Sequence, residues 1–242
     1  MNRSRLELSP GLWLDARRAV WLEDSRTLLV ADLHLGYAWA HRQRGNLLPI
    51  ESTEDTLDRL ETLAAEYSPS EIIVLGDVVH AEVKEEAVMD GLRRLHSLAA
   101  GVPVRLIVGN HDAQLARMLK QAGLETVLHE DIVLDGHLLI HGHGSDDTDA
   151  EFRCREVARR GGRVILGHEH PATVLSDGVA TTLRCPCFLV GDDVLVLPAF
   201  SPWSAGTNVR GGVFLSPFIR RAKLSQTITI VAGRLLPMPI RY

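Results

Sequence analysis

The stretch IIVLGDVVH, residues 72–80, contains the pattern on which the fold of this chain is built. Its four branched aliphatic residues in a row predict a strand buried on both faces, because a half-buried strand would alternate apolar and polar residues. Gly76 predicts a turn at the end of that strand, and Asp77 and His80 follow at once. The segment therefore joins a buried strand to two side chains that are capable of binding a metal.

Four more apolar runs have the same form. They are 28–31 before Asp32-Leu33-His34, 104–108 before Gly109-Asn110-His111-Asp112, 138–140 before His141-Gly142-His143, and 164–166 before Gly167-His168-Glu169-His170. Apolar residues at helical spacing predict helices over 53–67, 85–100, 113–122 and 149–160. Strands that alternate with helices predict a layered α/β fold, with parallel pairing in the first two thirds of the chain.

The sequence after His170 is typical of a β-rich region. Strand-like segments at 179–183, 188–190, 194–197, 212–215 and 227–231 alternate with turn signals, and 232–242 follows as a terminal strand or tail. These segments predict a second sheet. Without a long linker or repeat, we expect a single domain over 1–242, with a motif-bearing core at about 27–200 and a β-rich part at 172–242.

Composition narrows the class of protein. The 242 residues are 45% hydrophobic and 24% charged, which excludes a disordered or fibrous chain. A formal net charge of −5 excludes a globally basic nucleic-acid-binding surface, although arginines at 153–160 form a local basic group. Three cysteines make no disulfide framework, and the sequence has no signal peptide or apolar run long enough to span a membrane. We therefore expect a cytoplasmic protein that does not insert into a membrane.

The histidines are concentrated where the predicted strands end. Seven of the 11 histidines lie in the five turns listed above. Any one of them alone would be an ordinary surface or capping residue, but the carboxyl ends of parallel strands deliver their side chains to one place. Histidine, carboxylate and amide ligands suit Mn, Fe, Co, Ni or Zn. These candidate ligands are too many for one tetrahedral ion, so they favour two ions that share a carboxylate. Such pairs of ions occur in enzymes that catalyse in-line displacement at phosphorus.

The motifs DLH, GDxxH, GNHD, HGH and GHxH, in this order, resemble those of the calcineurin-like metallophosphoesterases. The resemblance covers about residues 27–200. ADLHLG at 31–36, LGDVVH at 75–80, GHEHP at 167–171, CPCFLV at 185–190 and LPAF at 197–200 resemble most the bacterial and archaeal members that include the DNA-ligase-associated phosphoesterases and the relatives of the SbcD nuclease subunit. The resemblance implies a four-layer αββα sandwich, two facing mixed sheets flanked by helices.

The resemblance also implies roles for individual residues. One metal would be held by Asp32, His34, Asp77 and His170, and the other by Asp77, Asn110, His141 and His168. The implied reaction is hydrolysis of a P–O bond by metal-hydroxide attack, with two divalent ions, Mn before Fe, Zn, Co or Ni. His111 would face the substrate and help to protonate the leaving oxygen or stabilise the charged phosphorane, and Asp112 would orient His111.

Several assignments stay open at the level of sequence. His80, His143, Arg42 and Arg44 are candidates for substrate contact or for orienting a ligand. We favour a phosphodiester substrate, with DNA as one candidate and a DNA-repair protein as a candidate partner. These choices rest only on analogy with the similar proteins named above. The rival readings are a phosphomonoesterase or nucleotide phosphatase, and a non-catalytic binding module that holds its metal for structure.

Overall fold

The structure is a computed structural model of the chain. It describes residues 4–46, 52–80, 85–98, 101–144, 147–176, 178–204, 206–220 and 223–240. None of the helices in these ranges is long and apolar enough to cross a membrane.

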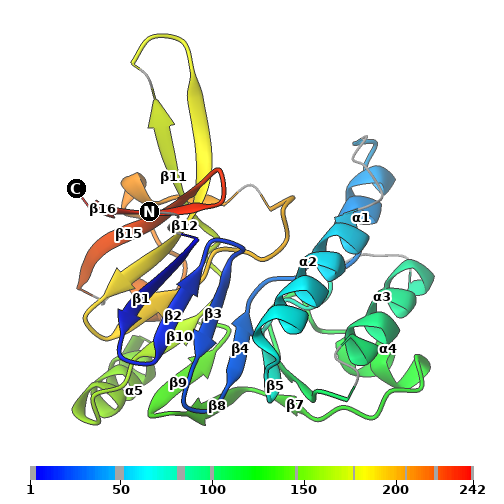
Figure 1. Ribbon diagram of the computed structural model, residues 1–242. Helices are drawn as coiled ribbons and strands as arrows, with labels where there is room; N and C mark the ends of the chain where they lie inside the picture. The colour runs from blue at the N-terminus through cyan, green and yellow to red at the C-terminus, as the bar shows by residue number, and fades with distance from the viewer. Residues whose placement is uncertain are drawn as a thin grey trace.

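The first sheet is formed by the N-terminal half of the chain (Figure 1). In spatial order its strands are β1 (Arg5–Ser9), β2 (Leu12–Asp15), β3 (Ala19–Leu22), β4 (Thr27–Val30), β5 (Glu71–Leu75), β6 (Val104–Ile107) and β7 (Leu128–His129). Strands β1 to β4 pair antiparallel, and β4 to β7 pair parallel. The helices of this half are α1 (Tyr37–Gln43), α2 (Ser52–Tyr67), α3 (Glu85–Ser97) and α4 (Leu115–Gln121).

The second sheet is formed by the C-terminal half and follows the order β14-β11-β12-β13-β10-β9-β8, with β15 beside β12 and β16 beside β15. These strands are β8 (Asp131–Leu134), β9 (His137–Ile140), β10 (Val164–Leu166), β11 (Pro171–Ser176), β12 (Thr182–Gly191), β13 (Val194–Val196), β14 (Thr207–Asn208), β15 (Leu224–Val231) and β16 (Arg234–Pro239). Helices α5 (Asp147–Arg159) and α6 (Pro217–Arg220) and the short helix η1 (Val209–Gly211) complete this half. The hairpin of β11 and β12 projects beyond the rest of the sheet (Figure 1).

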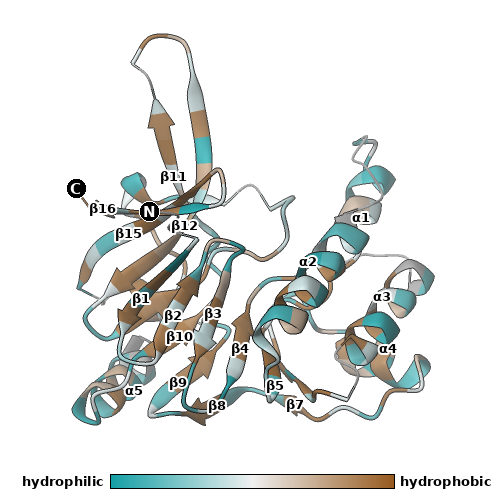
Figure 2. Ribbon diagram, in the orientation of Figure 1, coloured by the Kyte–Doolittle hydropathy of each residue, from teal (hydrophilic) through white to brown (hydrophobic). Residues whose placement is uncertain are grey.

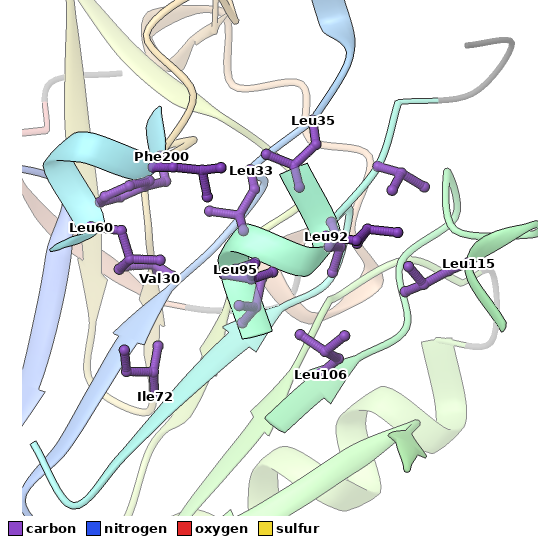
Figure 3. Close-up of a cluster of buried hydrophobic side chains, with 14 of the residues drawn as sticks. Val30, Leu33, Leu35, Leu60, Ile72, Leu92, Leu95, Leu106, Leu115 and Phe200 are labelled. Carbon is purple, nitrogen blue, oxygen red and sulfur yellow. The ribbon is translucent and has the colours of Figure 1, made fainter. Parts of the chain in front are cut away.

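The two sheets pack face to face because their strands are apolar on both sides. In β4, Leu28 and Val30 point to the cluster formed with α2, α3 and α4, whereas Leu29 points to the cluster between the sheets. The central strands are correspondingly hydrophobic along their length (Figure 2). Phe200 follows β13 in the chain yet joins the helix-covered cluster of the first sheet (Figure 3). This packing brings the ends of strands from both halves to one edge.

The outer helices match the predicted pattern. Leu57, Leu60 and Leu63 of α2 are buried at helical spacing in the cluster over the first sheet. On the far face of the second sheet, Cys154 and Val157 of α5 pack with Ile219 of α6. The layers therefore run helix, sheet, sheet, helix, and the predicted αββα class is confirmed.

Some local predictions differ from the structure. The motif strands do not share one sheet, since β4, β5 and β6 lie in the first and β9 and β10 in the second. Residues 212–215 are not a strand but a loop before α6, because the backbone N–H of Leu215 is bonded to the buried carboxylate of Glu169. The tail after Val231 includes β16. Strands β1 to β3, which carry none of the motifs, were not predicted.

Candidate metal centre

The candidate site lies where loops from the two sheets are hydrogen-bonded to each other. The backbone N–H of His168, after β10, donates to both carboxylate oxygens of Asp32, after β4, at 3.2 and 3.1 Å. The backbone N–H of Asp32 in turn donates to the carbonyl of Gly76, after β5, at 3.1 Å. These bonds fix the ends of three strands against one another before any ligand is considered.

A first group of four side chains gathers at this edge: Asp32, His34, Asp77 and His170, whose ligand atoms lie within 4.8 Å of one another. The Nε2 atoms of His34 and His170 are 3.2 Å apart, and Nε2 of His170 is 3.3 Å from Oδ1 of Asp32. Asp32 and His34 are almost fully buried. Two carboxylates and two imidazoles at this spacing are a donor set for a divalent transition metal.

The pKa values in this group follow from burial and mutual charge. Burial raises the pKa of Asp32, but the neighbouring His170, His141 and His34 outweigh it and bring the pKa to about 2. Burial and the charge of Asp32 raise the pKa of Asp77 to about 6. Burial also lowers the pKa of His34 well below its ordinary value, which leaves its imidazole neutral and able to donate a lone pair.

A second group lies on the other side of Asp77. Oδ1 of Asp77 is 3.4 Å from Nε2 of His141, and Oδ1 of Asn110 is 3.1 Å from the same nitrogen. Nδ1 of His141 lies 2.9 Å from the carbonyl oxygen of Leu75, which can only accept, so the proton sits on Nδ1 and Nε2 is free to bind a metal. The ring of His168 is 4.9 Å from that of His141. Burial, followed by the effect of His141, lowers the pKa of His168 to about 4.

The backbone of these residues is held in an unusual conformation. The candidate ligands with positive φ are Asp32 (57°), His34 (46°), Asp77 (50°), His168 (67°) and His170 (46°). L-residues adopt this region at a cost of order 1–3 kcal/mol each, and it persists where the surroundings enforce it, as at functional sites.

Close backbone approach explains two motif glycines. A Cβ at Gly109 would lie 2.2 Å from Oδ1 of Asp77, and a Cβ at Gly76 would lie 2.3 Å from Nδ1 of His141. Any side chain at these positions would push a candidate ligand out of the centre.

His111 and His80 border the group without belonging to it. Oδ1 of Asp77 accepts the backbone N–H of His111 at 2.9 Å, while the half-buried ring of His111 stacks on that of His80 with centroids 5.2 Å apart. Nδ1 of His80 lies 3.5 Å from Nδ1 of His34.

Asp112 connects the loops that follow two neighbouring strands of the first sheet. Its buried carboxylate accepts the backbone N–H groups of Val78, Val79 and Gly109, at 3.3, 3.1 and 2.8 Å. These bonds tie the loop after β5 to the loop after β6. Burial raises the pKa of Asp112 to about 6. Asp112 therefore positions the backbone of both loops, and its expected role in orienting His111 stays a prediction.

The remaining residues that the sequence predicted for the site lie farther from the candidate metal ligands. Arg42 and Arg44 lie exposed at the C-terminal end of α1. His143 is exposed, with its ring 5.3 Å from that of His141, at a cavity of about 440 Å³ that also borders Glu130 and Arg153. The arginines on α5 pair with carboxylates: Arg153 with Asp131 of β8, Arg155 with Glu151, and Arg159 and Arg160 with Glu156.

Sequence reasoning missed three side chains that support the site. Oγ of Ser204 is hydrogen-bonded to Nδ1 of His170, which leaves Nε2 of His170 directed at Asp32 and His34. Tyr37 and His41 of α1 pack near His80, with the Tyr37 and His80 rings 4.9 Å apart. None of the three lies in a recognisable motif, so no signal in the sequence pointed to them.

Comparison with known proteins agrees with this geometry. Residues 25–131 match the family model of the calcineurin-like phosphoesterases, and this range contains Asp32, His34, Asp77 and Asn110. This part of the chain is therefore similar to a calcineurin-like phosphoesterase domain. The match and the similarity to a solved nuclease support a metal-dependent hydrolase, and the cluster at the sheet edge is a candidate site for the metal.

One solved structure extends the similarity over nearly the whole chain. The nuclease MPE of Pseudomonas putida is 28% identical to this chain, with a TM-score of 0.68, over 98% of this chain and 100% of that one. Yfce, a phosphoesterase from E. coli, is 14% identical with a TM-score of 0.42, over 89% of this chain and 99% of that one. A comparison with curated proteins returns no match. The narrower placement with DNA-ligase-associated and SbcD-related groups stays a prediction.

Proposed function

We propose that this phosphoesterase is a phosphodiesterase that works with two divalent ions and cleaves a nucleic-acid strand. The observation that carries the proposal is the position of Asp77. Its Oδ2 lies 3.8 Å from Nε2 of His34 and its Oδ1 lies 3.4 Å from Nε2 of His141, so that one carboxylate faces two separate groups of ligands. A shared carboxylate offsets the repulsion between two dications.

In the proposed arrangement Asp32, His34, Asp77 and His170 hold one ion, and Asp77, Asn110, His141 and His168 hold the other. When bound, such a pair supplies Lewis acidity and lowers the pKa of water toward neutrality. We favour manganese, since carboxylate, amide and imidazole donors together suit it, with Fe, Zn, Co and Ni as competitors.

The side chains around the ligands have separate tasks. His111 is partly exposed beside Asp77 and donates a proton to the leaving oxygen or stabilises charge on the phosphoryl group. His80 stacks on His111 and limits the orientations of that ring. Asp112 keeps the loops that carry Asp77 and His111 at a fixed separation. His143, Arg42 and Arg44 stay candidates for contact with substrate.

Nucleic acid is favoured as the substrate because the relative from Pseudomonas putida, similar over its full length, is named a nuclease. The experiment is a plate assay on purified, metal-stripped protein that compares bis-p-nitrophenyl phosphate with p-nitrophenyl phosphate, with and without Mn²⁺. We expect Mn²⁺-dependent turnover with the diester ahead of the monoester. A preference for the monoester would replace this proposal with a phosphomonoesterase. Bound metal with no turnover of either would favour a binding module.

A further inference from the structure

A cavity of about 390 Å³ opens directly beside His170. It lies between the segment that follows β13 and the base of the β11–β12 hairpin, which projects from the second sheet in Figure 1. The side chains that matter for its chemistry are Arg18, Arg184, Trp203 and Ser204. None of the described residues that line it is acidic. The cavity at His143 differs, because Glu130 and Asp149 line it together with Arg153.

Arg18 brings a poorly compensated positive charge to this cavity. It lies in the turn before β3 with a φ of 72°, and its guanidinium donates to the carbonyl oxygens of Ala199 and Ser201 at 3.0 and 2.6 Å. Within the described part of the chain, no carboxylate lies within ion-pair distance of Arg18. Burial lowers the pKa of Arg18 to about 10. A largely buried cation without an anion is costly, and binding an anion would remove that cost.

Arg184 and Trp203 add two further features that suit an anionic strand. Arg184, on β12, is exposed, and its guanidinium donates to the carbonyl of Gly206 at 2.8 Å. The indole N–H of Trp203 is buried, and no hydrogen-bond acceptor for it is found among the described residues. Arg18, Arg184 and Trp203 thus all line the same cavity. Guanidiniums bind phosphate oxygens in pairs, and aromatic rings stack with bases.

The cavity has a fixed relation to the candidate metal centre. The backbone N–H groups of Phe200 and Ser201 donate to the carbonyls of Ala31 and Asp32, at 2.7 and 3.1 Å. On the other side, the guanidinium of Arg59 donates to the carbonyl of Phe200 and lies 4.3 Å from the centre of its ring. A ligand anchored in the cavity would therefore stand at a set distance from Asp32 and His170.

We propose that this cavity binds the phosphate next to the scissile one in a nucleic-acid strand, with Arg18 and Arg184 as its cationic contacts and Trp203 against the adjoining nucleoside. The inference rests on the proposed phosphodiesterase function and adds a requirement to it. A substrate with a second phosphate beside the cleaved bond is preferred to one without, because only the former fills the cavity.

The test uses a thymidine dinucleotide in three forms: unphosphorylated, 5′-phosphorylated and 3′-phosphorylated. In the holoenzyme with Mn²⁺, one terminal phosphate should lower KM by about 10-fold, the effect of one charge-assisted contact. In Arg184→Gln, the KM of the unphosphorylated dinucleotide and the KM of the preferred phosphorylated one should become nearly equal. Arg184→Lys should restore part of the difference between these two KM values. Arg159→Gln, which removes an exposed arginine on α5, is the matched control and should keep the wild-type ratio.

A second measurement does not depend on turnover. Fluorescence anisotropy of a labelled oligothymidylate on metal-stripped protein should show affinity lowered about 10-fold by Arg184→Gln and unchanged by Arg159→Gln. The dependence of log K on log salt should become shallower by about 0.7, the value for one phosphate contact of a single strand.

The outcomes separate this inference from the proposed function. If the wild type hydrolyses bis-p-nitrophenyl phosphate with Mn²⁺ but gains nothing from either terminal phosphate, the cavity is not a phosphate subsite and the phosphodiesterase function stands. If Arg159→Gln weakens binding as much as Arg184→Gln does, the inference is also wrong. If no diester is hydrolysed at all, the proposed function fails, and the anisotropy comparison alone decides on the cavity.

Discussion

The Nε2 atoms of His34 and His170 face each other at 3.2 Å, although 136 residues separate the two histidines in the chain. His34 follows a strand of the first sheet and His170 follows a strand of the second. Their rings meet nearly edge to face, at 78°. Burial lowers the pKa of His170, but the charges of Asp32 and Asp77 outweigh it and raise the pKa, so a proton can lie between the two nitrogens. A metal cation bound between them and Asp32 would take the place of that proton.

The first prediction concerns the carboxylate that faces both groups of ligands. Asp77→Asn should lower Mn²⁺-dependent turnover by more than about 100-fold, because loss of a ligand exceeds the 10- to 100-fold effect of losing a supporting hydrogen bond. Metal content measured after dialysis should fall as well. Asp58→Asn, which changes an exposed carboxylate on α2, serves as the control. Near-normal turnover and metal content in Asp77→Asn would rule out a shared ligand.

The second prediction separates catalysis from metal binding. His111→Ala should keep the bound metal while turnover falls by about 100-fold, the usual effect of a general acid or base. The ring of His111 lies 3.9 Å from Oδ2 of Asp77 and is partly open to solvent, as a group that meets substrate must be. The exposed His96 on α3 provides the control substitution to alanine. Loss of metal from His111→Ala would make His111 a ligand instead.

The third prediction tests the close backbone approach at the centre. Gly109→Ala would place a Cβ 2.2 Å from Oδ1 of Asp77, so the carboxylate must shift. We expect a loss of about 1–3 kcal/mol in the free energy of unfolding, as for other overpacked sites, together with weaker Mn²⁺ binding by calorimetry. Gly211→Ala is the comparison, since nothing lies within 4 Å of its added Cβ. Equal behaviour of the two variants would show that the loop adapts without cost.

The fourth prediction concerns acid stability and is independent of the metal centre. Burial raises the pKa of Asp15, but hydrogen bonds from the side chain and backbone of Arg17 and from Tyr67 outweigh it, so that the pKa lies below 3.8. A carboxyl group whose pKa is lower in the folded state stabilises that state fully when the pH is above the pKa of the unfolded state. This stabilisation is lost as the pH falls through the pKa of the folded state. The contribution should therefore disappear below about pH 4.

The variant Asp15→Asn should lower the free energy of unfolding at pH 7 by about 1–3 kcal/mol and flatten its decline between pH 5 and pH 2, measured by urea titration. The buried carboxylate holds Arg17 at 2.7 Å and Tyr67 at 2.9 Å, and the neutral amide would bind both less strongly, although Arg17 keeps its ion pair with Glu66. Asp192→Asn removes an exposed carboxylate 3.9 Å from Lys223 and should change little. An unchanged pH profile in Asp15→Asn would assign acid unfolding to other groups.

Much of the candidate site was accessible from sequence because its residues occur at a recurring position, just after a buried strand. Asp32, Asp77 and His168 were predicted in this way, and the structure brings them together. The role of Asp112 was not accessible, since an aspartate after GNH gives no sign of whether it bonds a ring or the backbone of another loop. Arg18 was missed for a similar reason, because it lies in a plain β-turn near the N-terminus.

The sequence by itself determined the layered α/β class, the candidate metal ligands and the strands that carry them, because buried strands and their terminal turns are encoded locally. Only the tertiary structure decided that these strands divide between two sheets and that the sheets face each other. It also decided that Ser204 orients His170 and that Arg18 and Arg184 share a cavity beside it. These relationships depend on packing between residues far apart in the chain, which local patterns of polarity do not specify.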